Sequence, residues 1–406
     1  MSKTMRTSRR EFLKAGLAGI AGASILARCT SDRTAPANPP KDRTIVRRTL
    51  GRTGLDLPVV SMGSSYAIDL VHPALDEGIV YIHTSSSYSE RNHERLLGEV
   101  FRDRPRNSFV IGTSPDLPYE FKGGGPSLDL GLDADPGLIL ESMDGSLRRL
   151  KLDFVDIYYL CSIGRAETAL HEPYLRAYDQ LKKSGKTRFV GIGTHSNEPE
   201  IIRAAAESGF WDVVLTSYNF RQTHHEDVRE AIGKAADAGL GVVAMKTQAG
   251  VYWDRARQRK INMTAALKWV LQDENVHTTI PAFSNYEEML EDLSVMEDLR
   301  LTPEEKRDLE LGAEHGLAGL FCQQCRQCQP QCPAGLEIPG LMRGYMYAFG
   351  HNEPGKALET LHGWNPDGLA CRDCAACTVR CALGFDVRTR ALELAGILES
   401  ERHRHS

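Results

Sequence analysis

The chain has 406 residues, of which 41% are hydrophobic and 25% are charged. This balance fits a soluble globular protein and excludes wholesale disorder, a collagen-like repeat and a polytopic membrane protein. The net charge of −5 is uneven, because residues 1–43 hold nine Lys or Arg against three Asp or Glu and carry +6, which leaves −11 on the remainder. An acidic remainder argues against nucleic acid as a partner, since phosphate binding requires a basic surface.

The first 43 residues have the pattern of a removable export signal followed by a linker. Residues 8–14 (SRREFLK) resemble the twin-arginine export signal, and the apolar run 15–27 is too short to span a bilayer comfortably. The stretch 31–42 contains three prolines and predicts a flexible tether. The resemblance implies export of the folded protein to the periplasm by the twin-arginine translocase. A surface amphipathic helix is the alternative; Cys29 leaves a membrane tether open, although Arg28 departs from the lipoprotein pattern.

Short apolar runs alternate with helical stretches across residues 44–300. The runs are rich in Val, Ile and Tyr, as buried parallel strands are, and a stretch such as 136–150 has its apolar residues on one helical face. Eight strands alternating with helices predict an α/β fold, the (β/α)8 TIM barrel. An open doubly wound sheet is the alternative, but no glycine-rich fingerprint follows the first run. The runs are 59–65, 80–84, 109–114, 155–161, 189–195, 213–219, 241–247 and 278–284.

A series of short motifs accompanies these runs: RTLGRTGL at 48–55, VSMG at 60–63, SE at 89–90, LLG at 96–98, GKTRFVG at 185–191, YN at 218–219, VAMK at 243–246, ALKW at 266–269 and IP at 280–281. Together they span 45–300 and resemble the aldo/keto reductase family, in the family's order. The resemblance implies a barrel that reduces carbonyl groups with a nicotinamide cofactor.

The resemblance also implies a catalytic tetrad of Asp, Tyr, Lys and His at the strand ends, and most of it is missing. The aspartate position holds His83, the tyrosine is kept as Tyr88, the lysine position holds Ser114, and the histidine position holds Cys161. Without a neighbouring lysine, Tyr88 is expected to titrate near its ordinary pKa of about 10.

The family's cofactor positions are altered as well. The positions that bind the nicotinamide carboxamide in the family hold Gly193, Thr194 and Leu215, and the position that follows the eighth strand carries two carboxylates at 287–288 where a 2′-phosphate would be bound. An unmatched buried amide costs about 1–3 kcal/mol. Of the cofactor-binding residues, only the stacking tyrosine, Tyr218, is retained, so NADPH is not expected as a cofactor.

Four polar residues lie at or just past predicted strand ends: His83, Tyr88, His195 and Lys246. Barrel active sites occupy this face, and imidazole has an ordinary pKa near 6.5, which suits proton transfer at neutral pH. We therefore predict these four as the catalytic residues, although a structural role is open for each one singly. The insertion 115–136 follows the third strand and is either a lid over this face or a mobile surface loop.

The C-terminal part begins with a helix start at Thr302, followed by Pro303 and a capping-box Glu305. Eight of the ten cysteines then form two runs of C-x2-C-x2-C-x3-C. This spacing predicts two 4Fe–4S clusters, rather than zinc or a disulfide knot, because in bacterial two-cluster ferredoxins the fourth cysteine of each run reaches the other cluster. The two predicted sets are Cys322, Cys325, Cys328 and Cys381, and Cys371, Cys374, Cys377 and Cys332.

Helical patterns at 338–349, 355–362 and 388–400 surround the second run. This arrangement resembles the α-helical ferredoxin module of respiratory electron-transfer subunits. We thus expect a leader and linker over 1–43, a barrel over 44–300, a connecting helix over 301–316 and a ferredoxin-like domain over 317–400.

These observations favour an exported iron–sulfur oxidoreductase. It would exchange electrons between a small hydroxy or carbonyl substrate and an external electron carrier or redox subunit. Three alternatives stay open: acid–base lyase or isomerase chemistry with structural clusters, a non-catalytic electron-transfer or binding subunit, and an NADPH-dependent reductase despite the substitutions. A difficulty for the favoured hypothesis is that a cluster moves one electron whereas an alcohol–carbonyl change needs two, and no flavin motif is visible.

Overall fold

Seven parallel strands form the main sheet of the computed structural model. The model describes residues 44–63, 67–88, 92–117, 121–122, 125–126, 130–361 and 369–405, so the predicted export signal lies outside the described residues. The strand order is β11-β10-β9-β8-β7-β4-β3, each strand lying beside its neighbour in the chain. Their bounds are β3 (Tyr81–His83), β4 (Val110–Thr113), β7 (Val155–Leu160), β8 (Thr187–Thr194), β9 (Val213–Ser217), β10 (Gly241–Met245) and β11 (Thr278–Thr279).

The segment 59–62 closes this sheet into a barrel. Val60 bridges Thr279 of β11 and Met62 bridges Ile82 of β3, both in the parallel sense. The backbone N–H of His83 donates to the carbonyl of Met62 at 2.8 Å. The predicted eight-stranded barrel is therefore confirmed, with the first strand reduced to single bridges on each side.

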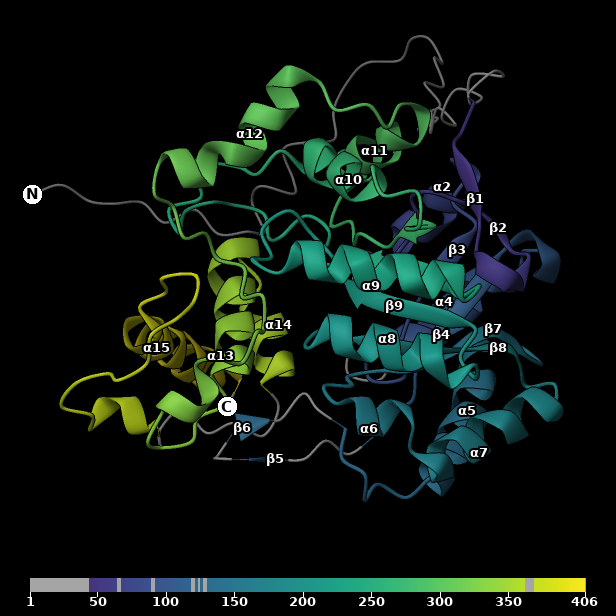
Figure 1. The fold of residues 1–406 in the computed structure, drawn as a ribbon, viewed down its shortest axis with the longest axis horizontal. Helices are drawn as coiled ribbons and strands as arrows, with labels where there is room; N and C mark the ends of the chain where they lie inside the picture. Colours follow the sequence, from purple (N-terminus) through teal and green to yellow (C-terminus); the bar gives the residue numbers. More distant parts are fainter. Residues whose placement is uncertain are drawn as a thin grey trace, which may run out of the picture. The chain divides into compact units, whose positions relative to one another are not determined.

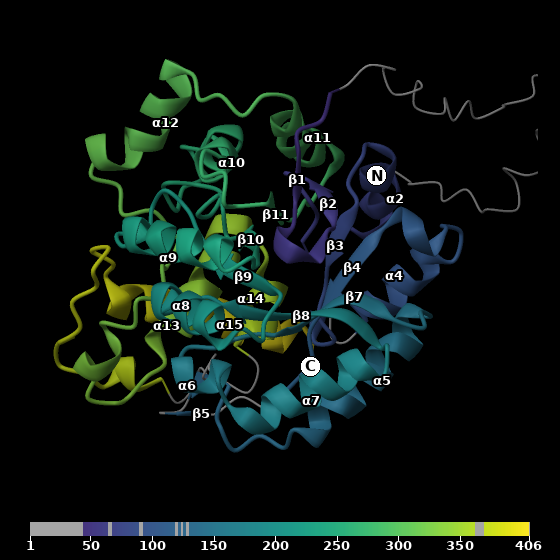
Figure 2. The ribbon, with the colours of Figure 1, turned by 45° about the vertical axis from the view of Figure 1, so that its right-hand side comes forward.

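Amphipathic helices cover the outside of the barrel (Figures 1 and 2). A large apolar core lies between the strands and these helices, as the one-sided patterns predicted. Gly98 of the LLG motif lets two helices approach closely, because a Cβ there would lie 2.4 Å from the carbonyl oxygen of Arg149. The helices are α2 (Val71–Asp76), α4 (His93–Phe101), α5 (Gly137–Leu150), α6 (Ala166–Ala169), α7 (Glu172–Lys183), α8 (Glu198–Ser208), α9 (His225–Asp237), α10 (Met263–Leu271) and α11 (Tyr286–Ser294).

An antiparallel hairpin closes the amino-terminal end of the barrel. It consists of β1 (Arg47–Thr49) and β2 (Asp56–Pro58), and it was not anticipated from the sequence. Leu50 and Leu57 belong to the same buried cluster as Tyr81 and Tyr159 of the barrel interior. A Cβ on Gly241, the first residue of β10, would lie 2.5 Å from the Leu50 side chain. This end of the barrel is thus filled, and polar chemistry is confined to the opposite end.

The insertion 115–136, predicted to be a lid or a mobile loop, contains a small hairpin of β5 (Phe121–Lys122) and β6 (Gly125–Pro126). Its described ends are anchored, because Leu117 and Leu130 are buried and the Leu130 N–H donates to the carbonyl of Ser162 at 2.9 Å. Among the described residues, no helix is both long enough and apolar enough to span a membrane.

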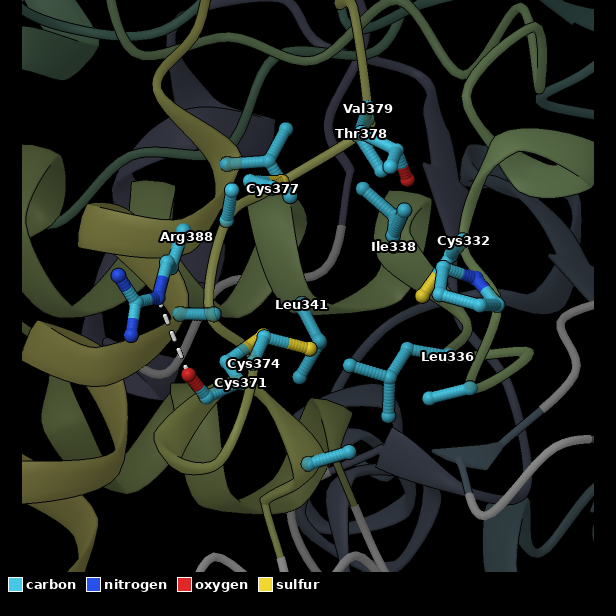
Figure 3. A pocket seen from close by; sticks show the side chains of 16 residues that line it. Cys332, Leu336, Ile338, Leu341, Cys371, Cys374, Cys377, Thr378, Val379 and Arg388 are labelled. Carbon is cyan, nitrogen blue, oxygen red and sulfur yellow. Dashed lines mark hydrogen bonds between the residues drawn. The ribbon is translucent and has the colours of Figure 1, made fainter.

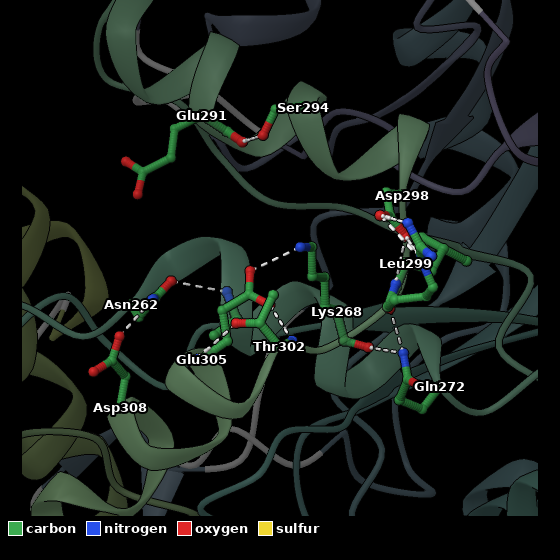
Figure 4. Close-up of polar contacts among 12 residues, drawn as sticks. Asn262, Lys268, Gln272, Glu291, Ser294, Asp298, Leu299, Thr302, Glu305 and Asp308 are labelled. Atoms are coloured by element: carbon green, nitrogen blue, oxygen red, sulfur yellow. Dashed lines mark hydrogen bonds and ion pairs between the residues drawn. The ribbon is translucent and has the colours of Figure 1, made fainter.

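The connecting helix α12 (Pro303–Glu314) is tied firmly to the barrel (Figure 4). Its predicted capping box is confirmed: the Thr302 hydroxyl accepts from the Glu305 N–H, and the Glu305 carboxylate accepts from the Thr302 N–H. The same carboxylate pairs with Lys268 of α10 at 2.7 Å, both side chains being nearly buried. A second bond joins Asn262 to Asp308 at 2.8 Å.

A second apolar core organises the C-terminal domain. Its helices are α13 (Ile338–Tyr345), the π-helical turn η6 (Met346–His351), α14 (Pro354–Thr360) and α15 (Val387–His405), close to the predicted positions. Shorter 3-10 turns are η1 (Gly51–Thr53), η2 (Ile68–Leu70), η3 (Arg106–Ser108), η4 (Val295–Glu297), η5 (Gln329–Gln331) and η8 (Ala370–Arg372). Ala249 of the loop after β10 is part of this second core. The domain therefore packs directly on a loop at the carboxyl end of the barrel.

Glu305→Ala should lower the free energy of unfolding by about 1–2 kcal/mol, because it removes half of the capping box together with the partner of Lys268. Urea denaturation measures this. Glu304→Ala is the matched control, since Glu304 is exposed one residue earlier in the same turn, and it should change stability by less than about 0.5 kcal/mol. Equal losses in the two variants would contradict the anchoring role.

Candidate functional site

Two cavities in the C-terminal domain are each lined by four cysteines. Cys332, Cys371, Cys374 and Cys377 line the first cavity (Figure 3). Cys322, Cys325, Cys328 and Cys381 line the second cavity. These are the two sets predicted from the sequence, each taking three cysteines from one run and the fourth from the other.

The thiols interact within their own sets. Burial raises the pKa of Cys322 to about 12, and Cys328, Cys381 and Cys325 add to this effect. Burial also raises the pKa of Cys371 to about 11, with Cys332, Cys374 and Cys377 contributing. Four thiols that disfavour each other's ionisation lie close together, and a bound cation reverses that preference by favouring thiolates.

Hydrogen bonds hold the crossed arrangement in place. Gln331, beside Cys332, accepts from the Thr378 hydroxyl through its carbonyl at 2.7 Å and from the Arg380 N–H through its side chain at 2.7 Å. Arg388 of α15 donates to the carbonyl of Cys371 at 3.1 Å, as Figure 3 shows. These contacts bring the end of the first run beside the second run. This closeness is required because each set takes its fourth cysteine from the other run.

The two cavities fit iron–sulfur clusters. The lining of the first cavity is otherwise apolar, with Leu336, Ile338 and Leu341 beside the cysteines. In the part of the chain that the structure describes, no three His, Cys, Asp or Glu side chains are placed to hold a single metal ion. Four thiolates around an apolar space suit a four-iron cluster.

At the carboxyl end of the barrel, His83 ends β3 and is 3% exposed. Its Nδ1 atom lies 3.4 Å from the hydroxyl of Tyr81, which shares a 2.9 Å hydrogen bond with Tyr159. Burial, with a smaller effect of His93, lowers the pKa of His83 to about 3. His83 is therefore a neutral imidazole that accepts or donates hydrogen bonds, and not the near-neutral proton-transfer group expected from its ordinary pKa.

Tyr88 lies beside His83, with ring centroids 6.5 Å apart in an edge-to-face arrangement. Its ring also faces that of His93 at 6.4 Å, and the Nδ1 atom of His93 is hydrogen-bonded to Thr84 at 2.7 Å. The Nζ atom of Lys356, from α14, lies 5.8 Å from the centre of the Tyr88 ring. The C-terminal domain thus places a cation over the one retained tetrad residue.

His195 and Lys246 follow β8 and β10 and lie near each other. Burial lowers the pKa of His195 well below 6.5, and Arg343, Lys246 and His83 lower it further. His195 is also a neutral imidazole at pH 7. The structure therefore brings the four predicted catalytic residues to one end of the barrel, while their catalytic roles stay predictions.

A tyrosine of the C-terminal domain joins this group and was missed in the sequence. Tyr347, in the π-helical turn η6, accepts a hydrogen bond from the Nζ atom of Lys246 at 3.1 Å. Arg343 of α13 acts electrostatically on both His195 and Tyr347. A residue in a separate domain carries no strand-end pattern, so spacing alone could not point to it. A π-helical turn often marks a functional site, but it is visible only in the structure.

The residues at the family's carboxamide-binding positions are occupied by other contacts. The Thr194 hydroxyl lies 2.7 Å from the carbonyl oxygens of Ile163 and Ser196. Leu215 is 1% exposed inside the barrel, and a Cβ on Gly193 would lie 2.7 Å from the sulfur of Cys161. Burial raises the pKa of Cys161 to about 12, so its thiol is neutral.

Tyr218, predicted to stack on a nicotinamide, is turned toward the helices. Its ring packs against Trp269 of α10 with centroids 5.2 Å apart, and it belongs to the core between sheet and helices. Only 3% of Tyr218 is exposed. The cofactor-binding role requires an open ring face, which this packing covers, so the role stays a prediction that the geometry disfavours.

The start of α11 is already capped by its own side chains. Asn285 accepts from the N–H of Glu288, and the Glu288 carboxylate accepts from the N–H of Ser284 at 2.8 Å. These groups satisfy amides that could otherwise bind a phosphate at a helix start, and they add negative charge.

Comparison with known proteins identifies both parts of the chain. The Aldo/keto reductase family model matches residues 50–264, which is more than half of the chain. The chain belongs to the aldo/keto reductase family. The 4Fe-4S dicluster domain model matches residues 321–386. This aldo/keto reductase is therefore an oxidoreductase barrel fused to a domain with the cysteines for two iron–sulfur clusters.

Curated relatives of this aldo/keto reductase share about a quarter of their residues with it. L-galactose dehydrogenase of Arabidopsis thaliana is 28% identical over 48% of this chain and 63% of its own length. L-glyceraldehyde 3-phosphate reductase of Escherichia coli O157:H7 is 25% identical over 70% of this chain and 97% of its own. An uncharacterized oxidoreductase of Bacillus subtilis is matched over 51% of its length. The chain thus spans about half to two thirds of the length of the Bacillus and Arabidopsis relatives.

Solved structures agree on the barrel fold. An aldo-keto reductase of Bacillus halodurans in its holo form has a TM-score of 0.52 at 20% identity, covering 66% of this chain and 96% of that one. An aldo-keto reductase of Klebsiella pneumoniae in complex with NADPH has a TM-score of 0.51 at 21% identity, covering 66% and 95%. At this identity the likeness concerns the fold.

The crossed cysteine sets of this aldo/keto reductase predict a specific pattern of iron loss. Anaerobically purified protein should hold about eight irons. Cys325→Ala with Cys381→Ala, both from one set, should leave about four. Cys325→Ala with Cys332→Ala, from the same run but different sets, should leave almost none. Iron assay and absorbance near 400 nm measure both.

Cys161→Ala is the control, because Cys161 lies in the barrel and should retain all the iron. If each run formed its own cluster, the two double variants would exchange their results, and the partition would be wrong.

Proposed function

We propose that this aldo/keto reductase exchanges electrons between a small hydroxy or carbonyl substrate, bound at the carboxyl end of the barrel, and an external carrier. The transfer uses the two iron–sulfur clusters in place of NADPH. The single observation that carries the proposal is the contact between Lys246 and Tyr347. It joins a predicted catalytic residue to the domain that holds the cluster cysteines.

Several contacts support a fixed relation between the barrel end and the cluster domain. In the loop after β9, the Thr223 N–H donates to the side chain of Gln323 at 2.8 Å, next to Cys322. Arg221 from the same loop donates to the carbonyl of Ala318. Gln323 is one residue and Ala318 four residues from the predicted cluster ligand Cys322, so the cluster domain is held against the barrel loops without a long linker.

The electron count is consistent with two clusters. Oxidation of one hydroxyl group to a carbonyl breaks one O–H and one C–H bond and releases two protons and two electrons. The two cysteine sets would hold two clusters, and each cluster would supply one-electron transfer. The chain's own residues must then orient the substrate and accept the protons. Two clusters would match the number of electrons released, although each moves one electron at a time.

NADPH independence rests on three separate features. The Thr194 hydroxyl is engaged by backbone carbonyls, Tyr218 is covered by Trp269, and Glu288 caps the start of α11. Each feature affects a different part of the cofactor: the carboxamide, the nicotinamide ring and the 2′-phosphate. Loss at three sites favours replacement of the cofactor over a change in its affinity.

Export is part of the same proposal. We propose that the twin-arginine translocase carries the folded, cluster-loaded protein to the periplasm, where free NADPH is not expected. An acidic mature chain and an external electron carrier or redox subunit agree with this location. A membrane tether through the leader remains an alternative for the final state, and nucleic acid is not a proposed partner.

NADPH should neither bind nor reduce the protein. Under anaerobic conditions, added NADPH is expected to leave tryptophan fluorescence and the absorbance near 400 nm unchanged, whereas dithionite bleaches that absorbance. A panel of small alcohols tested in the same way identifies substrates by bleaching. Saturable quenching by NADPH, followed by bleaching, would contradict the proposal.

The Cys325→Ala and Cys332→Ala double variant serves as the control for this assay. It should lose substrate-driven reduction of an artificial electron acceptor while retaining the barrel. Continued reduction at the unmodified rate would show that the clusters are not on the electron route.

A further inference from the structure

Three cationic side chains meet where the cluster domain contacts the barrel. Lys246 follows β10, Arg343 lies on α13, and Lys356 lies on α14. All three act on Tyr347. The Nζ atom of Lys246 donates a hydrogen bond to the Tyr347 hydroxyl and lies 5.7 Å from the centre of its ring. The Nζ atom of Lys356 lies 5.6 Å from the same ring centre, and Arg343 acts on Tyr347 through its charge. Positive charges repel each other, so this arrangement favours a bound anion.

The protein does not itself supply that anion to two of these cations. Among the residues that the structure describes, no carboxylate forms an ion pair with Lys246 or Arg343. The Nη2 atom of Arg343 is buried and has no hydrogen-bond partner there. A buried guanidinium nitrogen without a partner costs free energy unless a ligand satisfies it, and a planar guanidinium suits a carboxylate.

The backbone of Lys246 is held in an uncommon conformation. Its φ angle is +57°, in the left-handed region that residues with a Cβ rarely adopt. The Asn219 side chain, which is fully buried, donates to the Lys246 carbonyl at 3.1 Å, and the Ala249 N–H donates to the same carbonyl at 3.2 Å. Strain that is kept in place by buried contacts is typical of functional positions.

Tyr347 is suited to move a proton. Burial by itself would raise the pKa of Tyr347, but Lys246, Lys356 and Arg343 outweigh it and lower the pKa to about 8. Its other titratable neighbour is His351 in the same turn, with ring centroids 5.5 Å apart; burial, Lys246, Lys356 and Arg257 lower the pKa of His351 to about 4. Of these two groups, His351 is therefore neutral at pH 8 and Tyr347 is the one that titrates there.

We propose that the substrate is a small hydroxy or oxo acid whose anionic group is bound by Arg343, and that Tyr347, held by Lys246, exchanges the proton of its hydroxyl or carbonyl oxygen. The cluster domain thereby contributes side chains to the barrel site as well as electron carriers. This inference rests on the proposed function for its redox step, while the anion site and the proton step stand on the contacts themselves.

The proton step is balanced at one oxygen atom. In the oxidising direction, the phenolate of Tyr347 takes the proton of the substrate hydroxyl as its O–H bond breaks and the carbonyl forms. In the reducing direction, the Tyr347 hydroxyl gives its proton to the carbonyl oxygen, and Lys246 stabilises the resulting phenolate. With clusters bound in the two cysteine sets, the electron pair of the C–H bond would be carried to the external carrier, and the carbon-bound hydrogen would be released to water as a second proton.

The first test follows the phenolate absorbance at 295 nm as the pH is raised in the cluster-loaded protein. One tyrosine should titrate near pH 8 in the unmodified chain and be missing in Tyr347→Phe. Tyr345→Phe is the matched control, because this neighbour is hydrogen-bonded to Glu393 and its pKa is raised to about 12. A titration near pH 8 that persists in Tyr347→Phe would overturn the assignment.

The second test uses oxalate and inorganic phosphate as probes of the anion site. A bound anion should raise the midpoint of the Tyr347 titration by about one pH unit, since a nearby negative charge disfavours phenolate. Arg343→Met should raise the midpoint without any probe and remove the response to oxalate. If neither probe moves the midpoint of the unmodified protein, the anion site is wrong.

A third measurement separates this inference from the proposed function. Lactate and 1,2-propanediol differ by a carboxylate, and only lactate should bleach the clusters or compete with oxalate at Arg343. If the titration responds to anions but no alcohol bleaches the clusters, the anion site stands and the electron route fails. If propanediol reduces the clusters as well as lactate does, the route stands and the preference for acids fails.

In the oxidising direction, turnover should rise with pH through about 8, because the phenolate is the active form. Tyr347→Phe should abolish this rise and lower turnover by about 100-fold or more. Tyr345→Phe should keep the pH profile, which separates a proton-transfer role from a structural effect on the helix.

Discussion

A closed parallel sheet imposes one constraint on every other part of this molecule: all strands deliver their carboxyl ends to the same rim. The β1–β2 hairpin fills the opposite end with Leu50 and Leu57, so polar groups can gather only at that rim. His83, His195 and Lys246 reach it from three strands that are far apart in the sequence. The cluster domain packs on the loops of the same rim, and this brings the eight clustered cysteines and the polar end of the barrel into one unit.

The replacement of the family tetrad follows a consistent electrostatic logic. Where the family resemblance implies an aspartate and a lysine, this chain has His83 and Ser114, both buried and without formal charge at neutral pH. The positive charge has moved to Lys246 and to the cluster domain. A cation beside a tyrosine is thus retained as a chemical arrangement, but the tyrosine it faces is Tyr347 from another domain.

Much of this was readable from the sequence, because regular spacing encodes it. The eight apolar runs predicted the barrel, the capping box at Thr302 predicted α12, and the cysteine spacing predicted the two sets that line the cavities. What failed depends on packing between distant segments. The ordinary pKa of histidine could not anticipate the burial of His83. No local sequence pattern distinguishes Tyr347, which contacts Lys246 of the barrel, from Tyr345, which contacts Glu393 of its own domain.

The crossed cysteine sets also set an order on biosynthesis. Each cavity takes its fourth cysteine from the other run, so the cavity of Cys322 is incomplete until Cys381 has left the ribosome. Neither set of four cysteines is complete on a nascent chain that ends before Cys377. Loading of both sites therefore comes after synthesis of the barrel, and a chain cut between the two cysteine runs would carry two unfinished sites instead of one finished and one missing.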